Sequence, residues 1–154
     1  MTDTATYNNA TYETVTTEPS AKLRALDRLV GSWQVTGGAT GFVTYEWMAG
    51  GFFLLQHVEL GSDGHVESGL EVIGHLHPFM GEPSEHVHSR YYGGGGSTLD
   101  YVYELEGDEL TIWAGEVGSP AYYRGTFDES GDVLTGAWTY PVGGYESVAT
   151  RVSG

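Results

Sequence analysis

Four of the six histidines lie close together in the chain as two His-x-His pairs, His75 with His77 and His86 with His88. Side chains two residues apart in a strand point to the same face of the sheet. If the pairs lie on neighbouring antiparallel strands with His77 opposite His86, the other two histidines also face each other. Four imidazoles gathered in this way can supply the nitrogen ligands of Zn²⁺, Fe²⁺, Cu²⁺ or Ni²⁺.

Three interpretations of this histidine cluster are open from the sequence. The first is a transition-metal site. The second is a metal-free role, in which a histidine moves a proton or contacts a substrate. In the third, the histidines flank an acidic loop at the rim of the fold and have no function. The chain contains no cysteine, so disulfides and thiolate metal sites are excluded.

A second group of candidates consists of aromatic side chains and one arginine. The chain has 11 Tyr and 4 Trp but only six Lys and Arg. Rings with polar tips suit a cavity that holds a ring-bearing ligand. Arg124 either faces inward, where it needs a carboxylate or an anionic ligand, or lies on the acidic surface. The predicted ligand-binding residues are Tyr45, Trp47, His57, Tyr101, Tyr103, Trp113, Tyr122, Arg124 and Trp138.

The charge balance excludes some classes of partner. Twenty-one acidic residues against six basic ones give a formal net charge of −15. Such a chain repels phosphate backbones and anionic membrane surfaces, so we expect neither nucleic acid nor membrane as a partner. The first residues resemble no signal peptide, and no apolar run approaches the roughly 18 residues of a membrane span. We therefore expect a cytoplasmic protein.

The elements that position these candidates begin after a polar segment. Residues 1–19 are rich in threonine and predict a flexible tail. Ser20 has the chemistry of a helix N-cap, and the leucines that follow it predict a short helix ending at Gly31. The rest of the chain belongs to one domain, residues 20–154, of a size suited to a single core.

After this helix, short runs rich in β-branched and aromatic residues alternate with glycine-containing turns. The predicted strands are 32–36, 41–48, 51–60, 65–74, 85–92, 98–106, 109–115, 121–127, 133–139 and 144–152. Ten antiparallel strands in meander order would leave exposed edges unless the sheet closes. We therefore predict an all-β, up-and-down barrel of about ten strands, with the short N-terminal helix closing one end.

Two residues at opposite ends of the chain resemble a feature of the calycin superfamily, which includes lipocalins and fatty-acid-binding proteins. Trp33, in Gly31-Ser32-Trp33, follows the predicted helix, and Arg151 lies on the last predicted strand. In that superfamily an arginine of the final strand lies across the tryptophan of the first. The same pairing here would gain about 0.5–2 kcal/mol of cation–π energy and let Arg151 bind free carbonyls. Both residues are therefore assigned a structural role.

The chain as a whole, from about Leu26 to Val152, is similar to bacterial lipocalin-like domains of the DUF1579 type, with nitrobindin-like barrels as more distant relatives. The stretches that carry this resemblance are LVGSW, GGFFLLQ, GLEVIG, LDYVYELEGDELTIWAG, SPAYYRGTF and LTGAW. It implies a barrel around a small, largely apolar ligand and names no reaction. Nitrobindin-like proteins hold haem with a late histidine, but none follows His88, so haem is not expected.

The resulting functional hypothesis is a barrel that binds a small hydrophobic or aromatic molecule, as a monomer or homodimer. The alternative is an enzyme that uses the same cavity. It would be either metal-dependent through the four histidines or a cyclase-like catalyst that orients its substrate by shape and hydrogen bonds. The sequence shows no Ser-His-Asp spacing and no phosphate-binding glycine loop, so it does not decide between binding and catalysis.

Overall fold

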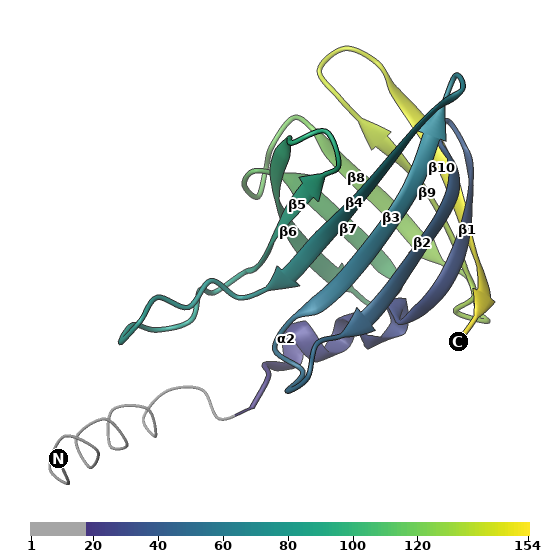
Figure 1. The fold of residues 1–154 in the computed structure, drawn as a ribbon. Helices are drawn as coiled ribbons and strands as arrows, with labels where there is room; N and C mark the ends of the chain where they lie inside the picture. The colour runs from purple at the N-terminus through teal and green to yellow at the C-terminus, as the bar shows by residue number, and fades with distance from the viewer. Residues whose placement is uncertain (1–17) are drawn as a thin grey trace, which may run out of the picture.

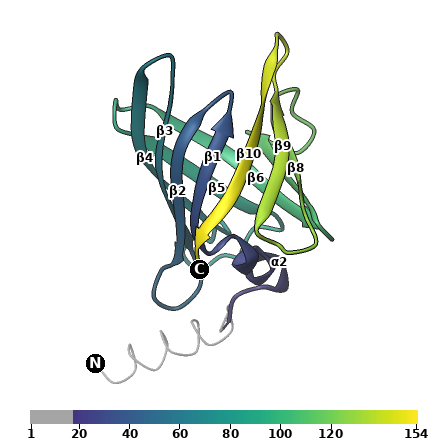
Figure 2. The same ribbon diagram turned by 90° about the vertical axis from the view of Figure 1, so that its right-hand side faces the viewer.

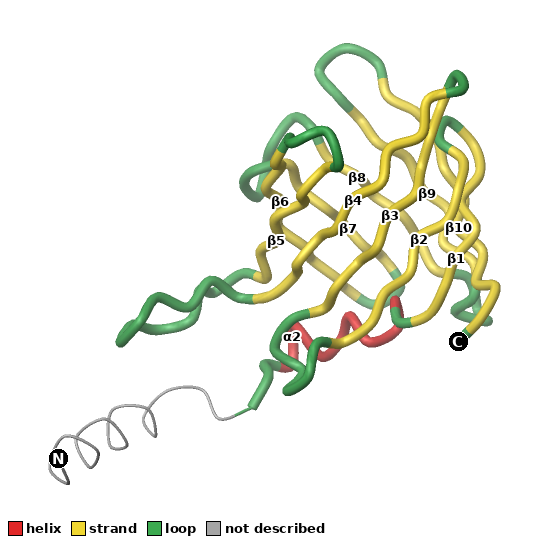
Figure 3. The backbone as a smooth tube through the Cα atoms, in the orientation of Figure 1, coloured by secondary structure: helices red, strands yellow, loops and turns green. Residues whose placement is uncertain are grey.

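The computed structural model describes residues 18–154, so most of the predicted tail lies outside the described residues. The described chain begins with a short helical segment and continues into strands (Figures 1 and 3). Helix α2 (Ala21–Arg24) starts at Ser20, whose Oγ accepts a hydrogen bond from the Leu23 amide at 3.1 Å. It runs directly into the 3₁₀ helix η1 (Ala25–Leu29). The predicted N-cap and helix are confirmed.

Ten strands follow, and all neighbouring pairs are antiparallel, which confirms the predicted all-β class. They are β1 (Gly31–Gly37), β2 (Thr40–Trp47), β3 (Leu54–Ser62), β4 (His65–Gly74), β5 (Val87–Gly93), β6 (Thr98–Glu106), β7 (Glu109–Ala114), β8 (Tyr122–Phe127), β9 (Val133–Thr139) and β10 (Gly144–Ser153). The main departures are β3, predicted from residue 51, and β5, predicted from residue 85. Both begin later than expected.

The sheet closes on itself through its first and last strands. β1 pairs with β2 on one side and with β10 on the other, and the remaining strands follow in chain order. Figure 2 shows β1 beside β10, with helix α2 below the barrel. Closure provides every strand with two hydrogen-bonded neighbours and so removes the edges that an open meander would expose. The predicted closed barrel is therefore confirmed.

The helical segment closes one end of the barrel. Leu23, Leu26 and Leu29 recur every three residues and are almost completely buried. They join the core cluster that includes Trp33 and Leu110. Burying side chains of this kind is worth about 1.5–3 kcal/mol each, which fixes a segment too short to be stable alone. Among residues 18–154, no helix combines the length and apolar character needed to cross a membrane.

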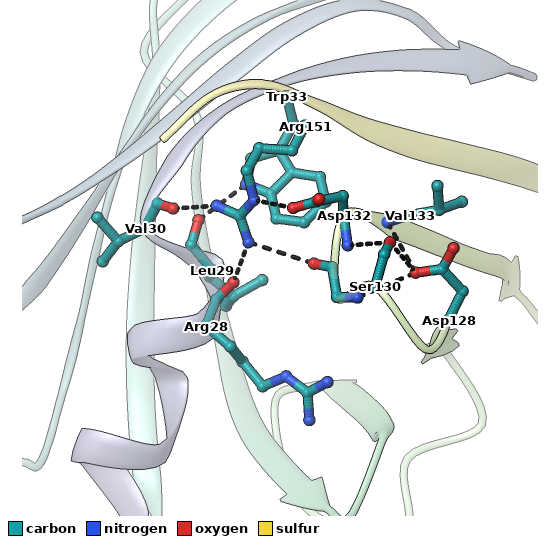
Figure 4. Close-up of polar contacts among 10 residues, drawn as sticks. Arg28, Leu29, Val30, Trp33, Asp128, Ser130, Asp132, Val133 and Arg151 are labelled. Carbon is teal, nitrogen blue, oxygen red and sulfur yellow. Dashed lines mark hydrogen bonds and ion pairs between the residues drawn. The ribbon is translucent and has the colours of Figure 1, made fainter.

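Arg151 stabilises this closed end through stacking and hydrogen bonds (Figure 4). Its guanidinium lies 4.2 Å from the centroid of the Trp33 ring, and its Nε donates to Asp132 at 2.8 Å. Its Nη1 donates to the carbonyl of Val30, and its Nη2 donates to the carbonyl of Arg28 at 2.7 Å. The predicted stacking and the predicted capture of carbonyls at the start of the barrel are both confirmed.

Candidate functional site

A cavity of about 470 Å³ occupies the barrel interior. At the closed end it reaches Leu29 and Trp33. Towards the other end it is lined by Ala39, His65 and Tyr140, which belong to or border the β1–β2, β3–β4 and β9–β10 connections. These connections lie at the end of the barrel away from the helix (Figure 1). The volume falls within the range of small-molecule sites, about 300–1,000 Å³.

One half of the cavity wall, formed by β2 to β5, carries a polar belt. We use this name for Tyr45, Gln56, Glu71 and Tyr91, which are direct partners across successive strands: Tyr45 with Gln56, Gln56 with Glu71, and Glu71 with Tyr91. All four line the cavity. Because partners in a ladder face the same side of a sheet, one row of the barrel brings an amide, a carboxyl and two hydroxyls together.

Glu71 is the only acidic residue among the described ones that is buried, at 5% exposed. Its Oε2 accepts hydrogen bonds from Ser89 Oγ at 2.5 Å and from the Tyr103 hydroxyl at 2.8 Å. Burial raises the pKa of the Glu71 carboxyl, and these two hydrogen bonds oppose part of that rise. A carboxyl group with such an environment, facing a cavity, is typical of a functional site.

The tyrosines around Glu71 remain neutral over the physiological pH range. Burial, followed by the nearby Glu71 carboxylate, raises the pKa of Tyr45 and of Tyr103 well above the ordinary value. Burial also raises the pKa of Tyr91 to about 12. The hydroxyls therefore act as hydrogen-bond donors and acceptors, not as charges. Gln56 Nε2, for example, donates to the Tyr45 hydroxyl at 2.8 Å.

The other half of the wall carries an aromatic cluster centred on Trp138. The Trp138 ring lies 5.9 Å from Tyr101, 5.6 Å from Tyr123 and 6.1 Å from Tyr140, measured between centroids. The Trp138 and Tyr140 rings are nearly parallel, at 6°. Tyr145 on β10 extends the cluster, with its ring 6.5 Å from Tyr140. All of these side chains line the cavity, so this wall offers flat apolar faces to a ligand.

Two glycines let tyrosines lie flat against the wall, which keeps the cavity open. A Cβ added at Gly69 would overlap the Tyr91 hydroxyl, and one added at Gly125 would overlap the Tyr123 hydroxyl. The tyrosine in each case covers the surface that the missing side chain leaves bare. Any larger residue at these positions would push the ring away from the wall.

The structure brings four of the nine predicted ligand-binding residues to the cavity: Tyr45, Tyr101, Tyr103 and Trp138. Their contact with a ligand stays a prediction. The other five, Trp47, His57, Trp113, Tyr122 and Arg124, do not line it. On β8 the buried residues are Tyr123, Gly125 and Phe127, so Tyr122 and Arg124 belong to the opposite face. These five residues therefore lie outside the cavity wall, and the geometry gives their predicted contact with a ligand in the interior no support.

The outward residues have partners of their own. The Arg124 guanidinium lies 4.9 Å from the Tyr122 ring centroid and 5.6 Å from that of Trp113, and its Nε donates to Thr111 Oγ1 at 3.2 Å. The His57 side chain is 52% exposed and contacts Glu46. Trp47 donates from Nε1 to Asp27 Oδ1 at 2.8 Å, beside the helical segment. These contacts explain the residues without any ligand.

The predicted four-histidine metal site is not formed. The β4–β5 ladder ends with Gly74 opposite His88, so His75, His77 and His86 lie in the connection and the predicted pairing does not occur. Burial, and then the nearby His86 and His75, lowers the pKa of His88. Even so, no three His, Asp or Glu side chains within residues 18–154 are arranged to hold a metal ion.

Two of these histidines bind protein groups instead. His75 contacts Ser20 Oγ through Nε2 and the Ser84 carbonyl through Nδ1, both at 2.7 Å. His77 Nε2 lies 2.9 Å from the Gly81 carbonyl. His75 thus ties the N-cap of helix α2 to the β4–β5 connection, and both nitrogens of its ring are used. The histidine segment organises a loop outside the barrel.

The sequence reasoning missed the centre of the polar belt. Gln56, Glu71 and Ser89 are absent from the predicted ligand-binding residues. A usable signal was the alternation within β4, where Glu71 lies two residues from Ile73, a fully buried residue. Strand periodicity places the two side chains on the same face. The expectation that acidic residues face solvent concealed this signal.

No known protein-family model matches the sequence, and no curated protein shows significant similarity to it. The resemblance to DUF1579-type domains therefore stays a prediction. The chain itself forms a closed ten-stranded barrel with one polar and one aromatic cavity wall.

Proposed function

We propose that this protein binds a small molecule with an aromatic or other hydrophobic body inside the barrel. The observation that carries the proposal is the cavity of about 470 Å³, lined by the aromatic cluster on one side and the polar belt on the other. A few convergent polar groups within a mostly apolar pocket are typical of ligand sites, where the apolar part supplies affinity and the polar groups fix orientation.

The energetics of the wall favour a flat, apolar ligand. The rings of Tyr101 and Tyr123 both pack against Trp138, so little side-chain freedom remains to be lost when a ligand packs on them. Each Å² of apolar surface removed from water contributes about 25 cal/mol. Aromatic contacts add about 0.5–1.5 kcal/mol per pair. These terms support micromolar or tighter binding of a ligand that fits.

A matched pair of substitutions on β3 tests the proposal. Val58 lines the cavity, whereas the adjacent His57 is exposed on the outer face. Val58→Phe should fill part of the cavity and weaken the binding of naphthylmethanol, a neutral aromatic probe, by at least about tenfold, or ~1.4 kcal/mol. His57→Phe adds the same ring outside and should leave the affinity nearly unchanged. Calorimetric titration of both variants and the wild type provides the comparison.

Two results would contradict the proposal. One is an equal loss of affinity in both variants, which would show that binding does not depend on the interior. The other is the absence of binding to the wild-type protein by a panel of neutral aromatic probes small enough for the cavity. Thermal unfolding of each variant would verify that both are folded.

A further inference from the structure

The polar belt holds a hydrogen-bond acceptor that the protein leaves unused. Both hydrogen bonds to Glu71 end on Oε2, and Oε1 has no partner among the described residues. Within residues 18–154, no fully buried side-chain nitrogen or oxygen lacks a hydrogen bond. Oε1 is therefore in reach of the cavity that Glu71 lines. Burial disfavours the ionised form of this carboxyl, and a cationic donor from a ligand at Oε1 would offset that cost, because a buried charge is costly only while it lacks a partner.

The charges around the cavity all favour a cationic ligand over an anionic one. All six Lys and Arg of the chain lie within residues 18–154, and none of them lines the cavity. Glu67 and Glu71 do line it. Burial, and then nearby carboxylates that include Glu71, raises the pKa of Tyr45, Tyr91, Tyr101 and Tyr103, so these tyrosines are neutral. A carboxylate ligand would therefore find hydroxyl donors but no Lys or Arg, and His65, the histidine of the described lining, lies at the end of the cavity away from the helix.

The aromatic cluster adds to this preference. The faces of Trp and Tyr rings carry negative potential, and a cation within about 6 Å of a ring centroid gains about 0.5–2 kcal/mol. Trp138 and Tyr101 face the same cavity as Glu71. Tyr101 lies on β6, next to β5 and close to the polar belt in the order of the strands. A protonated amine at Glu71 would thus have a carboxylate and aromatic rings as its neighbours.

We infer that the barrel selects ligands that combine an aromatic body with a protonated amine, and that the amine binds Glu71 Oε1. The inference rests on the proposed function and specifies its ligand class. Glu71 is a specificity-determining residue in this account, with Ser89 and Tyr103 holding its other oxygen in place. Fatty acids and other carboxylates are excluded as preferred ligands, since their charge would face Glu71 in a site without Lys or Arg.

The test uses three matched probes at neutral pH: naphthylmethylamine, which is protonated, naphthylmethanol, which is neutral, and naphthoate, which is an anion. Calorimetric titration of the wild-type protein should give the order amine, alcohol, anion, with about tenfold or more between the first and the last. Glu71→Gln keeps an acceptor for Ser89 and Tyr103 but removes the charge. This substitution should lower the affinity for naphthylmethylamine by at least about tenfold and change the affinity for naphthylmethanol by less than about threefold.

Glu46→Gln is the matched control because Glu46 does not line the cavity; its side chain is 60% exposed and contacts His57 on the outer face of the barrel. It removes the same charge and should change amine affinity by less than about threefold. The inference is overturned if naphthoate binds as tightly as the amine, or if Glu46→Gln weakens amine binding and Glu71→Gln does not. Binding of all three probes with equal affinity overturns it too, but leaves the proposed function standing. If no probe binds, the proposed function itself fails.

Discussion

The closed end of the barrel and the polar belt of the cavity both place a charged side chain among buried groups, but they treat it differently. At the closed end, Arg151 donates to Asp132 and to the carbonyls of Arg28, Val30 and Gly131. In the cavity, Glu71 uses one carboxyl oxygen for Ser89 and Tyr103 and leaves the other towards open space. A saturated charge stabilises a fold, whereas a half-used one is available to a ligand.

The largest expected effect comes from removing Arg151 from the closed end of the barrel. Arg151→Ala leaves three backbone carbonyls without a donor and removes the cation from the Trp33 ring. We expect the free energy of unfolding to fall by roughly 2–4 kcal/mol. Chemical denaturation measures this loss. Arg90→Ala, which removes an exposed ion pair with Asp100, is the control and should leave the unfolding midpoint nearly unchanged. Equal effects of both variants would contradict the structural role of Arg151.

A second substitution perturbs the cavity wall without touching a charge. Gly125→Ala should displace the Tyr123 ring into the cavity, cost about 1–3 kcal/mol of stability and weaken ligand binding. Gly95→Ala is the control, because a Cβ there meets no atom within 4 Å. It should leave stability and binding nearly unchanged. Denaturation and titration with naphthylmethanol are the measurements. Equal binding by both variants would show that Tyr123 does not shape the site.

The third prediction concerns the pH dependence of stability and distinguishes the buried Glu71 carboxyl from the Asp128 carboxyl. Burial raises the pKa of Glu71 in the folded state, so its contribution to stability is present below the unfolded pKa, about 4.3, and is lost as pH rises through the folded pKa. Glu71→Gln cannot ionise and should gain stability relative to the wild type as pH rises from 4 towards 8. Thermal unfolding over this range measures the difference. The groups facing Glu71 titrate above this range, since they are tyrosines with raised pKa values.

Asp128→Asn should change the pH dependence of stability in the opposite direction. A hydrogen bond from Ser130 lowers the pKa of Asp128, so its stabilising contribution is present above the unfolded pKa and lost as pH falls. Relative to the wild type, this variant should therefore lose stability as pH rises through the acidic range. Parallel pH profiles for the Glu71 and Asp128 variants would contradict the distinction drawn between the two carboxyls.

The smallest expected effect belongs to the histidine segment. His75→Ala removes the contacts with Ser20 and the Ser84 carbonyl and should cost about 1 kcal/mol. His86→Ala, whose ring has no hydrogen bond among the described residues, is the comparison and should have a smaller effect on stability. Neither should alter the affinity for naphthylmethanol, because neither residue lines the cavity. A loss of binding in either variant would show that the histidine segment does contribute to the ligand site.

The fold could be predicted from the sequence because its signals are local. Gly-containing turns separate runs of strand-forming residues, and Ser20 followed by regularly spaced leucines marks the helix. Trp33 and Arg151 could be paired through the resemblance to the calycin superfamily, in which an arginine of the last strand lies across the tryptophan of the first, and closure does place these two strands side by side. Tyr45, Tyr101, Tyr103 and Trp138 could be assigned to the interior by residue type.

The phase of β8 could not be predicted, because Tyr122 and Tyr123 are adjacent and of the same type. Either of them can fill an interior, and the choice depends on register with β7 and β9, which is set by the whole barrel. The histidine segment failed for another reason. The Leu76 amide donates to Ser84 Oγ, which donates to the His86 carbonyl, so local side-chain hydrogen bonds replace the ladder beyond Gly74. The spacing of the histidines in the sequence therefore predicted a four-histidine cluster that the fold does not form.

The most direct test of the central claim is a crystal structure of the protein with naphthylmethylamine. We expect the naphthalene ring inside the barrel against Trp138 and Tyr101, with the amine nitrogen about 2.7–2.9 Å from Glu71 Oε1. The hydrogen bonds of Ser89 and Tyr103 to Oε2 should remain in place. A ligand bound outside the barrel, or one whose amine points away from Glu71 towards Glu67, would contradict the account.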